Sequence, residues 1–577
     1  MCIRYTPHAF VMTDFKTVWD KTNIGENYPG VTSPLTYSFI RKAYSNVYLN
    51  FIRLVGVAEE KINKDKTIFD NMLGYVQGEV FYNIDNWYKL IKLLPGYQYN
   101  KDFFENMLGP VKHNKSIEDK IITPRIIWTN RKAIIKFSRY IIYTKPLYRK
   151  FDNEFNDHYA FFKSLNIKKL DNFDLVFAFE QLQTKFFSTW SYTIVNDFKV
   201  MVFYGVLTNF INKHFPKESN EKLISIYGVK NKPESIKPLR KLIYLAKLIK
   251  STKNYKSIFN KDTNSIINEL KKSEYEILNS EINEYLSLYG DRAFNELKLE
   301  DVDFRDKPES LIAILKEYVI YSEKDLDNVL HKINAKKQND LNSDAKALNF
   351  INRYIYNYLS ENTQKAIFKR EEYRLKRAKV FNIAKSFFKE IALRMVEAGS
   401  LNSTNDIFFL YTDEVFDYIR FHKLDEDFIT LVNKRGKLLK RYEEKPLPRR
   451  ITTVGLPRIT KFKTYKNSFH KTNHHPGKAT SQAATIKAKA VVMPKLNLET
   501  NVKGKILITE STDPGWTVLF PLIKGIVIEK GGVLSHASIV ARELGIPCLV
   551  LPDATKIIHS NSEIVMNTYK GFIITNI

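Results

Sequence analysis

Cysteine is almost absent from this sequence of 577 residues, which contains only Cys2 and Cys548. Two cysteines cannot build the disulfide framework of a small secreted domain. Long apolar runs are missing too, because the longest, from Val200 to Ile211, is too short and too interrupted to span a bilayer. The amino terminus also lacks the apolar core of a signal peptide. We therefore expect a cytoplasmic protein with no membrane-spanning segment.

Acidic residues are scarce beside basic ones, with 63 Asp and Glu against 90 Lys and Arg and a formal net charge of +27. A basic protein gains affinity for nucleic acid by releasing counterions from the phosphate backbone. Before about Lys445, however, the basic residues alternate with Asp, Glu and Asn, as is typical of solvated helix faces. We therefore do not expect nucleic acid to be the main partner.

Glycine is infrequent in residues 1–442, where apolar residues recur at spacings of three and four. This spacing is typical of amphipathic helices. The clearest predicted helices cover 237–251, 310–322 and 378–399, and Gly399 is a typical residue at the end of the last one. A hydrophobic fraction of 44% is ample for buried cores. The sequence therefore predicts a large, mainly α-helical region.

Residues 443–484 differ in composition from the helical region. Between Lys445 and Leu498 there are twelve basic residues and no Asp or Glu. This composition predicts a basic linker over 443–484 that leads into a further domain. The linker also carries three histidines, His470, His474 and His475. No cysteine or carboxylate lies nearby to complete a ligand set, so we expect no metal site.

The pattern changes again over residues 485–577, where short apolar runs alternate with turn signals and short helices. Strands are predicted at 487–493, 504–509, 525–530, 546–551, 563–568 and 571–576. A helix is predicted to begin after Thr512, which would be its N-cap, with a proline in the first turn. Such alternation favours a compact layered α/β domain with crossover helices.

Within this domain, the segment GGVLSHASIVARELGIP at 531–547 places His536 where a helix begins. Gly531 and Gly532 allow a tight turn, and Ser535 is a typical N-cap residue. A helix N-terminus carries a partial positive charge and N–H groups without intrahelical partners. It therefore favours a neutral imidazole and stabilises an anion attached to that ring. The pattern predicts a nucleophilic histidine that becomes a phosphohistidine.

The same segment closely resembles the phosphohistidine signature of the swivelling, or mobile, domain of phosphoenolpyruvate-utilising enzymes. This family includes phosphoenolpyruvate synthase, pyruvate phosphate dikinase and rifampin phosphotransferase. One departure is Ser538, where alanine is common. Three further segments are similar to the central region of such proteins: 19–48, 289–300 and 369–415. The resemblance implies a β/β/α swivelling domain over 485–577 in which His536 is the phosphorylated residue.

The family's nucleotide-binding, ATP-grasp-like domain normally precedes the segment at 19–48, where only about 18 residues stand here. No glycine-rich phosphate loop replaces that domain. Either ATP and Mg²⁺ bind at a separate ATP-grasp subunit, as we expect, or the protein has lost the first half-reaction. By the resemblance, that subunit would pass the β-phosphoryl group of ATP to His536, and the swivelling domain would carry it to a small-molecule acceptor.

The helical region is expected to bind this acceptor, as it does in rifampin phosphotransferase. Basic residues in the similar segments are candidates for anion contacts, or else they lie on solvated helix faces. They are Arg292, Arg370, Arg374 and Arg377. Arg542, near the far end of the His536 helix, is expected at the domain surface or in docking. An alternative function is a non-catalytic phosphocarrier, signalling or ligand-binding protein that retains the swivelling domain.

Overall fold

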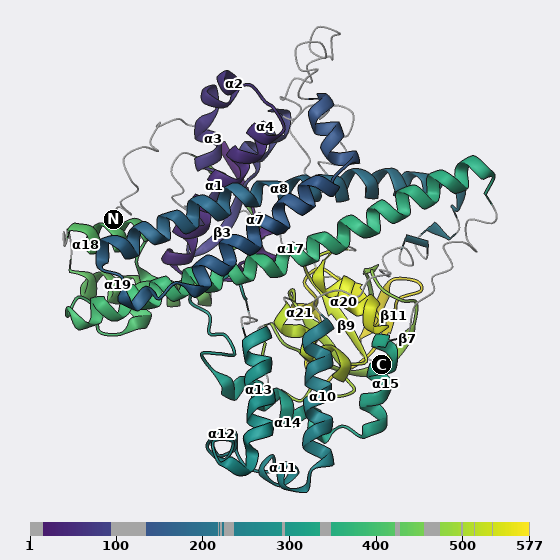
Figure 1. Ribbon diagram of the computed structural model, residues 1–577. Helices are drawn as coiled ribbons and strands as arrows, with labels where there is room; N and C mark the ends of the chain where they lie inside the picture. The colour runs from purple at the N-terminus through teal and green to yellow at the C-terminus, as the bar shows by residue number, and fades with distance from the viewer. Residues whose placement is uncertain are drawn as a thin grey trace. The chain divides into compact units, whose positions relative to one another are not determined.

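The computed structural model describes residues 16–93, 134–216, 218–219, 222–223, 236–290, 295–334, 348–421, 427–454, 473–494, 496–497, 500–512, 514–532 and 535–575. The chain forms two compact units, and most of their helices and some of their strands are labelled in Figure 1. The first unit consists of Met1–Tyr140, Asn166–Ser191 and Phe388–Phe469. The second consists of Ile141–Leu165, Tyr192–Phe387 and His470–Ile577. Two long helices contribute residues to both units, α8 (Asn172–His214) and α17 (Phe350–Glu397).

The first unit contains a four-stranded antiparallel sheet in the order β2-β3-β1-β4. Its strands are β1 (Lys16–Asp20), β2 (Leu73–Val76), β3 (Glu79–Asn83) and β4 (Arg450–Val454). Gln77 and Gly78 have positive φ angles of 47° and 73°, as a type I′ hairpin turn requires. β4 lies within the predicted linker at 443–484. A strand is stable there because Ile451 packs with Phe81 in a small apolar core.

Aromatic residues join the helices of the first unit. Phe39 of α1 lies against Phe179 of α8 and Phe388 of α17, with ring centroids 6.1 and 6.4 Å apart. Tilted and edge-on ring contacts of this kind add to the free energy of apolar burial. The helices of this unit besides α8 and α17 are α1 (Pro34–Leu54), α2 (Glu59–Lys64), α3 (Lys66–Asp70), α4 (Ile84–Leu93), α18 (Thr412–Phe421) and α19 (Phe428–Glu444).

The helices predicted over 237–251 and 310–322 are present in the second unit as α10 (Lys237–Ser251) and α14 (Pro308–Ile320). The helix predicted over 378–399 is the last part of α17, and Gly399 has the positive φ of 73° that is typical after a helix end. Other helices of the second unit are α7 (Lys145–Ser164), α11 (Lys253–Ile258), α12 (Thr263–Glu269), α13 (Glu276–Tyr289) and α15 (Glu323–Asn334).

Among the described residues, α8 is the one helix long and apolar enough, by length and composition, to cross a membrane. Half of its most apolar 18-residue window is buried inside the structure. Core helices of soluble proteins have the same length and composition, so α8 is weak evidence for a membrane span.

The carboxyl-terminal part of the second unit is built on an eight-stranded mixed sheet in the order β5-β12-β11-β7-β8-β9-β10-β6. The neighbours from β7 to β10 are parallel and the others antiparallel. The strands are β5 (His474–Pro476), β6 (Lys478–Ala479), β7 (Thr485–Val492), β8 (Ile506–Thr509), β9 (Gly525–Ile528), β10 (Cys548–Val550), β11 (Glu563–Asn567) and β12 (Phe572–Thr575). With α20 (His536–Leu544) and α21 (Ala554–Ile557), they confirm the predicted fold class. β5 and β6 also lie within the predicted linker.

The helix predicted to begin after Thr512 differs from the prediction in type and in start. It is a 3₁₀ helix, η7 (Pro514–Leu522), with Pro521 inside it. A proline removes a backbone N–H and disturbs the α-helical hydrogen-bond pattern. Thr512 is buried, but its hydroxyl has no hydrogen-bond partner among the described residues, so it caps no helix there.

One apolar core connects this sheet domain to α10, α13 and α14. Buried residues of the helices, such as Leu242 and Leu311, belong to the same cluster as Trp516 and Phe520 of η7. The Tyr318 hydroxyl, buried in this cluster, donates a hydrogen bond of 2.5 Å to the backbone carbonyl of Val518. The helices and the sheet domain therefore share one interior.

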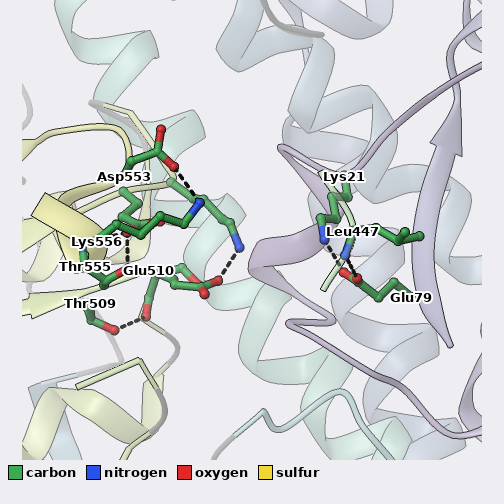
Figure 2. Close-up of polar contacts among 11 residues, drawn as sticks. Lys21, Glu79, Leu447, Thr509, Glu510, Asp553, Thr555 and Lys556 are labelled. Carbon is green, nitrogen blue, oxygen red and sulfur yellow. Dashed lines mark hydrogen bonds and ion pairs between the residues drawn. The ribbon is translucent and has the colours of Figure 1, made fainter. Parts of the chain in front are cut away.

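A buried ion pair joins β3 to the residue that follows β1, and a hydrogen bond joins β3 to the segment that precedes β4. The Lys21 ammonium contacts the Glu79 carboxylate, which also accepts a hydrogen bond of 2.6 Å from the Leu447 N–H (Figure 2). Glu79 is 3% exposed and Lys21 is 8% exposed. Removing one partner of a buried pair leaves the other charge away from water.

Glu79→Ala should therefore lower the free energy of unfolding by about 3–5 kcal/mol, because the Lys21 ammonium loses its carboxylate. Thermal unfolding followed by circular dichroism measures the change. The control is Glu59→Ala, which removes an exposed ion pair with Arg53 and should leave the melting temperature unchanged. Equal melting temperatures for Glu79→Ala and the wild type would contradict the structural role of the pair.

Candidate functional site

His536 is the first residue of α20, as the sequence predicts. Ser535 precedes it with extended backbone angles, φ −71° and ψ 156°, which suit an N-cap. Its hydroxyl does not accept a hydrogen bond from the first turn, however. It donates one of 3.0 Å to the Ser538 hydroxyl. The capping part of the prediction is therefore wrong for the side chain, although the position is right.

The glycines around the helix serve different purposes. Gly531 has a φ of 121° and Gly545 a φ of 66°, which side chains other than glycine rarely adopt. Gly545 ends α20 in the left-handed conformation of a helix C-terminus. At Gly532 a Cβ atom would meet nothing within 4 Å, so this position is open. Backbone conformation therefore requires glycine at 531 and 545.

The imidazole of His536 is buried, at 2% exposure, between two hydrogen-bond partners. Its Nδ1 atom lies 3.1 Å from Oε2 of Glu371, and its Nε2 atom lies 3.2 Å from the hydroxyl of Thr517. An ionised carboxylate can only accept a hydrogen bond, so Nδ1 carries the proton. In the neutral ring Nε2 then has a free electron pair, to which the Thr517 hydroxyl donates. The structure therefore selects Nε2 as the nucleophilic nitrogen.

Glu371 lies on α17 and is itself buried, at 6% exposure. Burial acts to raise the pKa of its carboxyl. The hydrogen bond from His536, the positive charge of that ring when it is protonated, and the charges of Arg374 and Arg370 outweigh burial and lower the pKa to about 2. Glu371 is therefore an ionised acceptor at physiological pH.

The predicted arginines on α17 lie near this pair, and each faces a carboxylate. Arg370 Nε is 3.5 Å from Oδ1 of Asp197 on α8, and Arg374 Nε is 3.8 Å from Oε1 of Glu296. Burial raises the pKa of Asp197, and the charges of Arg370 and Arg377 oppose that rise. The structure therefore places Arg370 and Arg374 close enough to act on Glu371, and Arg377 close enough to act on Asp197. Arg292 and His470 lie outside the described residues.

Arg542 does not lie at the surface. It is 2% exposed, and its Nη1 atom donates a hydrogen bond of 3.0 Å to the Thr480 carbonyl. Burial lowers its pKa to about 10, so the guanidinium stays charged at neutral pH. The surface prediction is wrong because α20 is covered on several sides, and of its nine residues only Glu543 is not buried.

A chain of hydroxyl groups fixes α20 to the neighbouring strands. The Ser538 hydroxyl donates to the Thr480 hydroxyl at 2.8 Å, and the Thr480 N–H donates to the Cys548 carbonyl at 3.0 Å. Ser538 and Thr480 are both fully buried. Serine at 538 therefore adds a polar link that alanine could not make.

Glu529 and Lys530, directly after β9, are also held by polar contacts. The Glu529 carboxylate accepts hydrogen bonds from the N–H and the hydroxyl of Thr555, and the Lys530 ammonium contacts the Glu510 carboxylate (Figure 2). Gly531 follows Lys530 in the chain. These contacts therefore fix the point from which the turn towards His536 begins.

Glu371 and Thr517 are the site residues that the sequence did not identify. Glu371 stands three residues before Arg374, a spacing that places both on one helix face. This spacing could have indicated that Glu371 lies near the candidate arginines, but it did not show which histidine the Glu371 carboxylate contacts. Within the described residues, no group of three His, Cys, Asp or Glu side chains could hold a metal ion.

Two family models match parts of the chain. Residues 501–571 match the PEP-utilising enzyme mobile domain, and residues 198–371 match the rifampicin phosphotransferase fourth domain. The first match includes His536, and the second ends at Glu371. The predicted relationship to phosphoenolpyruvate-utilising enzymes and rifampicin phosphotransferases is confirmed.

Curated proteins that are similar to this chain are named as phosphotransferases or as a transferase. The rifampicin phosphotransferase of Bacillus subtilis (strain 168) is 27% identical over 51% of this chain and 34% of its own length. That of Bacillus cereus is 34% identical over 32% of this chain and 20% of its own length. The prodigiosin synthesizing transferase PigC of Serratia marcescens is 27% identical over 51% of this chain and 33% of its own. The aligned part thus spans about a third or less of each relative.

Arg542→Leu should lower the free energy of unfolding by about 1–3 kcal/mol, because the buried Thr480 carbonyl loses its donor. The measurement is the melting temperature, followed by circular dichroism. Lys556→Leu is the matched control, since its basic side chain is 70% exposed and its loss should leave the melting temperature unchanged. If both variants behave like the wild type, Arg542 is not the buried residue described above.

Proposed function

We propose that this chain, whose residues 501–571 match the mobile domain of PEP-utilising enzymes, is the phosphohistidine carrier of an ATP-dependent phosphotransferase. The named relatives support a phosphotransferase with a phosphohistidine domain. The observation that carries the proposal is the pair of contacts at His536. Glu371 holds the proton on Nδ1, and Nε2 keeps the electron pair that attacks phosphorus.

The relay has three displacements. In the first, the Nε2 electron pair forms a bond to the β-phosphorus of ATP, the bond from that phosphorus to the α,β-bridging oxygen breaks, and AMP leaves. In the second, water attacks the γ-phosphorus and the bond from that phosphorus to the β,γ-bridging oxygen breaks, which releases inorganic phosphate and leaves one phosphoryl group on Nε2. In the third, an acceptor oxygen forms a bond to the remaining phosphorus, and the electron pair of the Nε2–P bond returns to Nε2. A covalent intermediate divides one difficult transfer into two steps at separately organised sites.

ATP and Mg²⁺ are proposed to bind at a separate ATP-grasp subunit in the cytoplasm. His536 is almost fully buried against Glu371, so it must leave this position to reach a nucleotide on another subunit. Movement of the mobile domain between two sites would meet this requirement. The position seen here, against α17, then corresponds to the acceptor side of the relay.

The acceptor is proposed to be a small molecule with a nucleophilic oxygen, bound by the helical region. Arg370 and Arg374 support this, because their guanidinium groups lie beside the carboxylate that contacts His536. Arginine binds phosphoryl oxygens through planar, charge-assisted hydrogen bonds. Arg370 is close to half-exposed and accessible to such a group.

Incubation with ATP labelled in the β-phosphoryl group and a separately produced ATP-grasp subunit should place acid-labile label on the wild-type chain. His536→Ala should carry none, because the nucleophile is gone. His559→Ala is the control, since this exposed histidine has no part in the site and the label should remain. Equal label on His536→Ala and the wild type would refute the carrier role. Label that never reaches a small molecule would favour a signalling phosphocarrier.

A further inference from the structure

We infer that Glu371 is a positioning residue for the acceptor half of the relay, because its carboxylate holds a proton on Nδ1 of His536 while the phosphoryl group is on Nε2. The inference rests on the proposed function and assigns a role in it to a residue of α17. Glu371 touches neither the phosphorus nor the acceptor in this role. It acts through the imidazole.

The geometry allows the contact in one position of the mobile domain only. Glu371 lies 165 residues before His536 in the sequence, on α17 and outside the sheet domain. Its Oε2 atom is 3.1 Å from Nδ1, and both side chains are almost fully buried. When His536 moves to a nucleotide on another subunit, Glu371 remains behind. Its effect is therefore confined to the step that takes place against α17.

The proton on Nδ1 determines whether the group that leaves phosphorus is a neutral imidazole or an imidazolate anion. When Nδ1 is protonated, the ring of the phosphohistidine is positively charged, and breaking the Nε2–P bond gives a neutral imidazole. Without that proton, the same bond breaking gives an imidazolate anion, a far poorer leaving group. The acceptor oxygen forms the new O–P bond, and its own proton passes to water. A carboxylate beside Nδ1 favours the charged ring and so favours the transfer.

Several charged groups face the pair from the elements packed around it. They are Arg370 and Arg374 on α17, Asp197 on α8, Glu296 before α14, and Arg542 on α20. The charges of Arg370 and Arg374 are opposed by Asp197 and Glu296. The charge of Arg542 acts against a protonated ring. Glu371 is the carboxylate in hydrogen-bond contact with the imidazole, so its charge has the largest effect in favour.

The pH dependence follows with a definite sign. Glu371 has a pKa of about 2 and stays ionised across the neutral range, so the shared proton belongs to the histidine. In this inference the hydrogen bond to the adjacent ionised carboxylate outweighs burial of the ring and raises the pKa of the phosphohistidine above its value in the unfolded chain. Below the pKa that the ring has in the unfolded chain, the phosphohistidine is therefore fully in its reactive, protonated form. It loses this proton only as the pH rises through the higher pKa that the ring has in the folded protein.

The test uses the full chain loaded on His536 with potassium phosphoramidate, which requires no ATP-grasp subunit. The phosphohistidine signal that is missing from His536→Ala belongs to His536, and its loss, with water as acceptor, is followed by ³¹P NMR over a pH series. In the wild type the rate should stay on its plateau to a higher pH than in the urea-unfolded chain. Glu371→Gln should bring the midpoint of the pH profile back towards the unfolded value. The rate at a pH above both midpoints should then fall about tenfold for every pH unit by which the midpoint moves.

Glu372→Gln is the matched control, because it removes the same charge from the neighbouring residue of α17. Glu372 pairs with Lys369 and Lys376, and none of its ion pairs involves His536. Its pH profile should match the wild type. A Glu371→Gln profile that coincides with the wild type would overturn the inference. A failure of ATP to label His536 would count against the proposed function alone, because phosphoramidate loads the histidine independently.

A second measurement needs no phosphoryl group. In protein labelled with ¹⁵N in its histidines, the signals missing from His536→Ala identify the ring nitrogens of His536. In the wild type and in Glu372→Gln they should show a proton on Nδ1 and none on Nε2. A proton on Nε2 of the wild type would overturn the inference, because Glu371 would then not hold the ring as described.

Discussion

The hydrogen bond between His536 and Glu371 is the interaction on which the arrangement of the site depends. It decides which ring nitrogen carries the proton and leaves the other one nucleophilic. It also sets the amino-terminal end of α20 against α17, where Arg370 and Arg374 lie. A buried histidine without an acceptor at Nδ1 would have no fixed tautomer, and its nucleophilic atom would be undefined.

The two sides of the mobile domain differ in chemistry. Towards α17 the contact is polar and charged, between the His536 imidazole and the Glu371 carboxylate. Towards α10 and α14 the contacts are apolar, and Trp516 and Phe520 belong to a core shared with those helices. Apolar burial stabilises by about 25 cal/mol per Å², whereas polar groups regain hydrogen bonds to water when they separate. Separation of the mobile domain from α17 therefore costs less free energy than its separation from α10 and α14.

Local features of the site could be predicted from the sequence, since they depend on neighbours in the chain. The bounds of α20 follow from glycine and serine at its ends, and the strands around it follow from short apolar runs. Features that depend on distant partners could not. Glu371 meets a residue 165 positions away, and Arg542 looked exposed because a helix pattern does not show what covers the helix. β4 was predicted as part of the linker because the basic residues around it gave no sign that it pairs with β1, a strand near residue 16.

The pairing of β4 with β1 has a consequence for synthesis and folding. The side-chain hydrogen bond from Trp19 to Thr453 spans 434 residues, so one edge of β1 has no partner strand until more than 400 further residues have been made. At about 5–20 residues per second, that interval is roughly 20–90 s on the ribosome. During this time an open strand edge is available to other chains. The first unit is thus completed late in synthesis, and its open strand edge must be protected from aggregation until then.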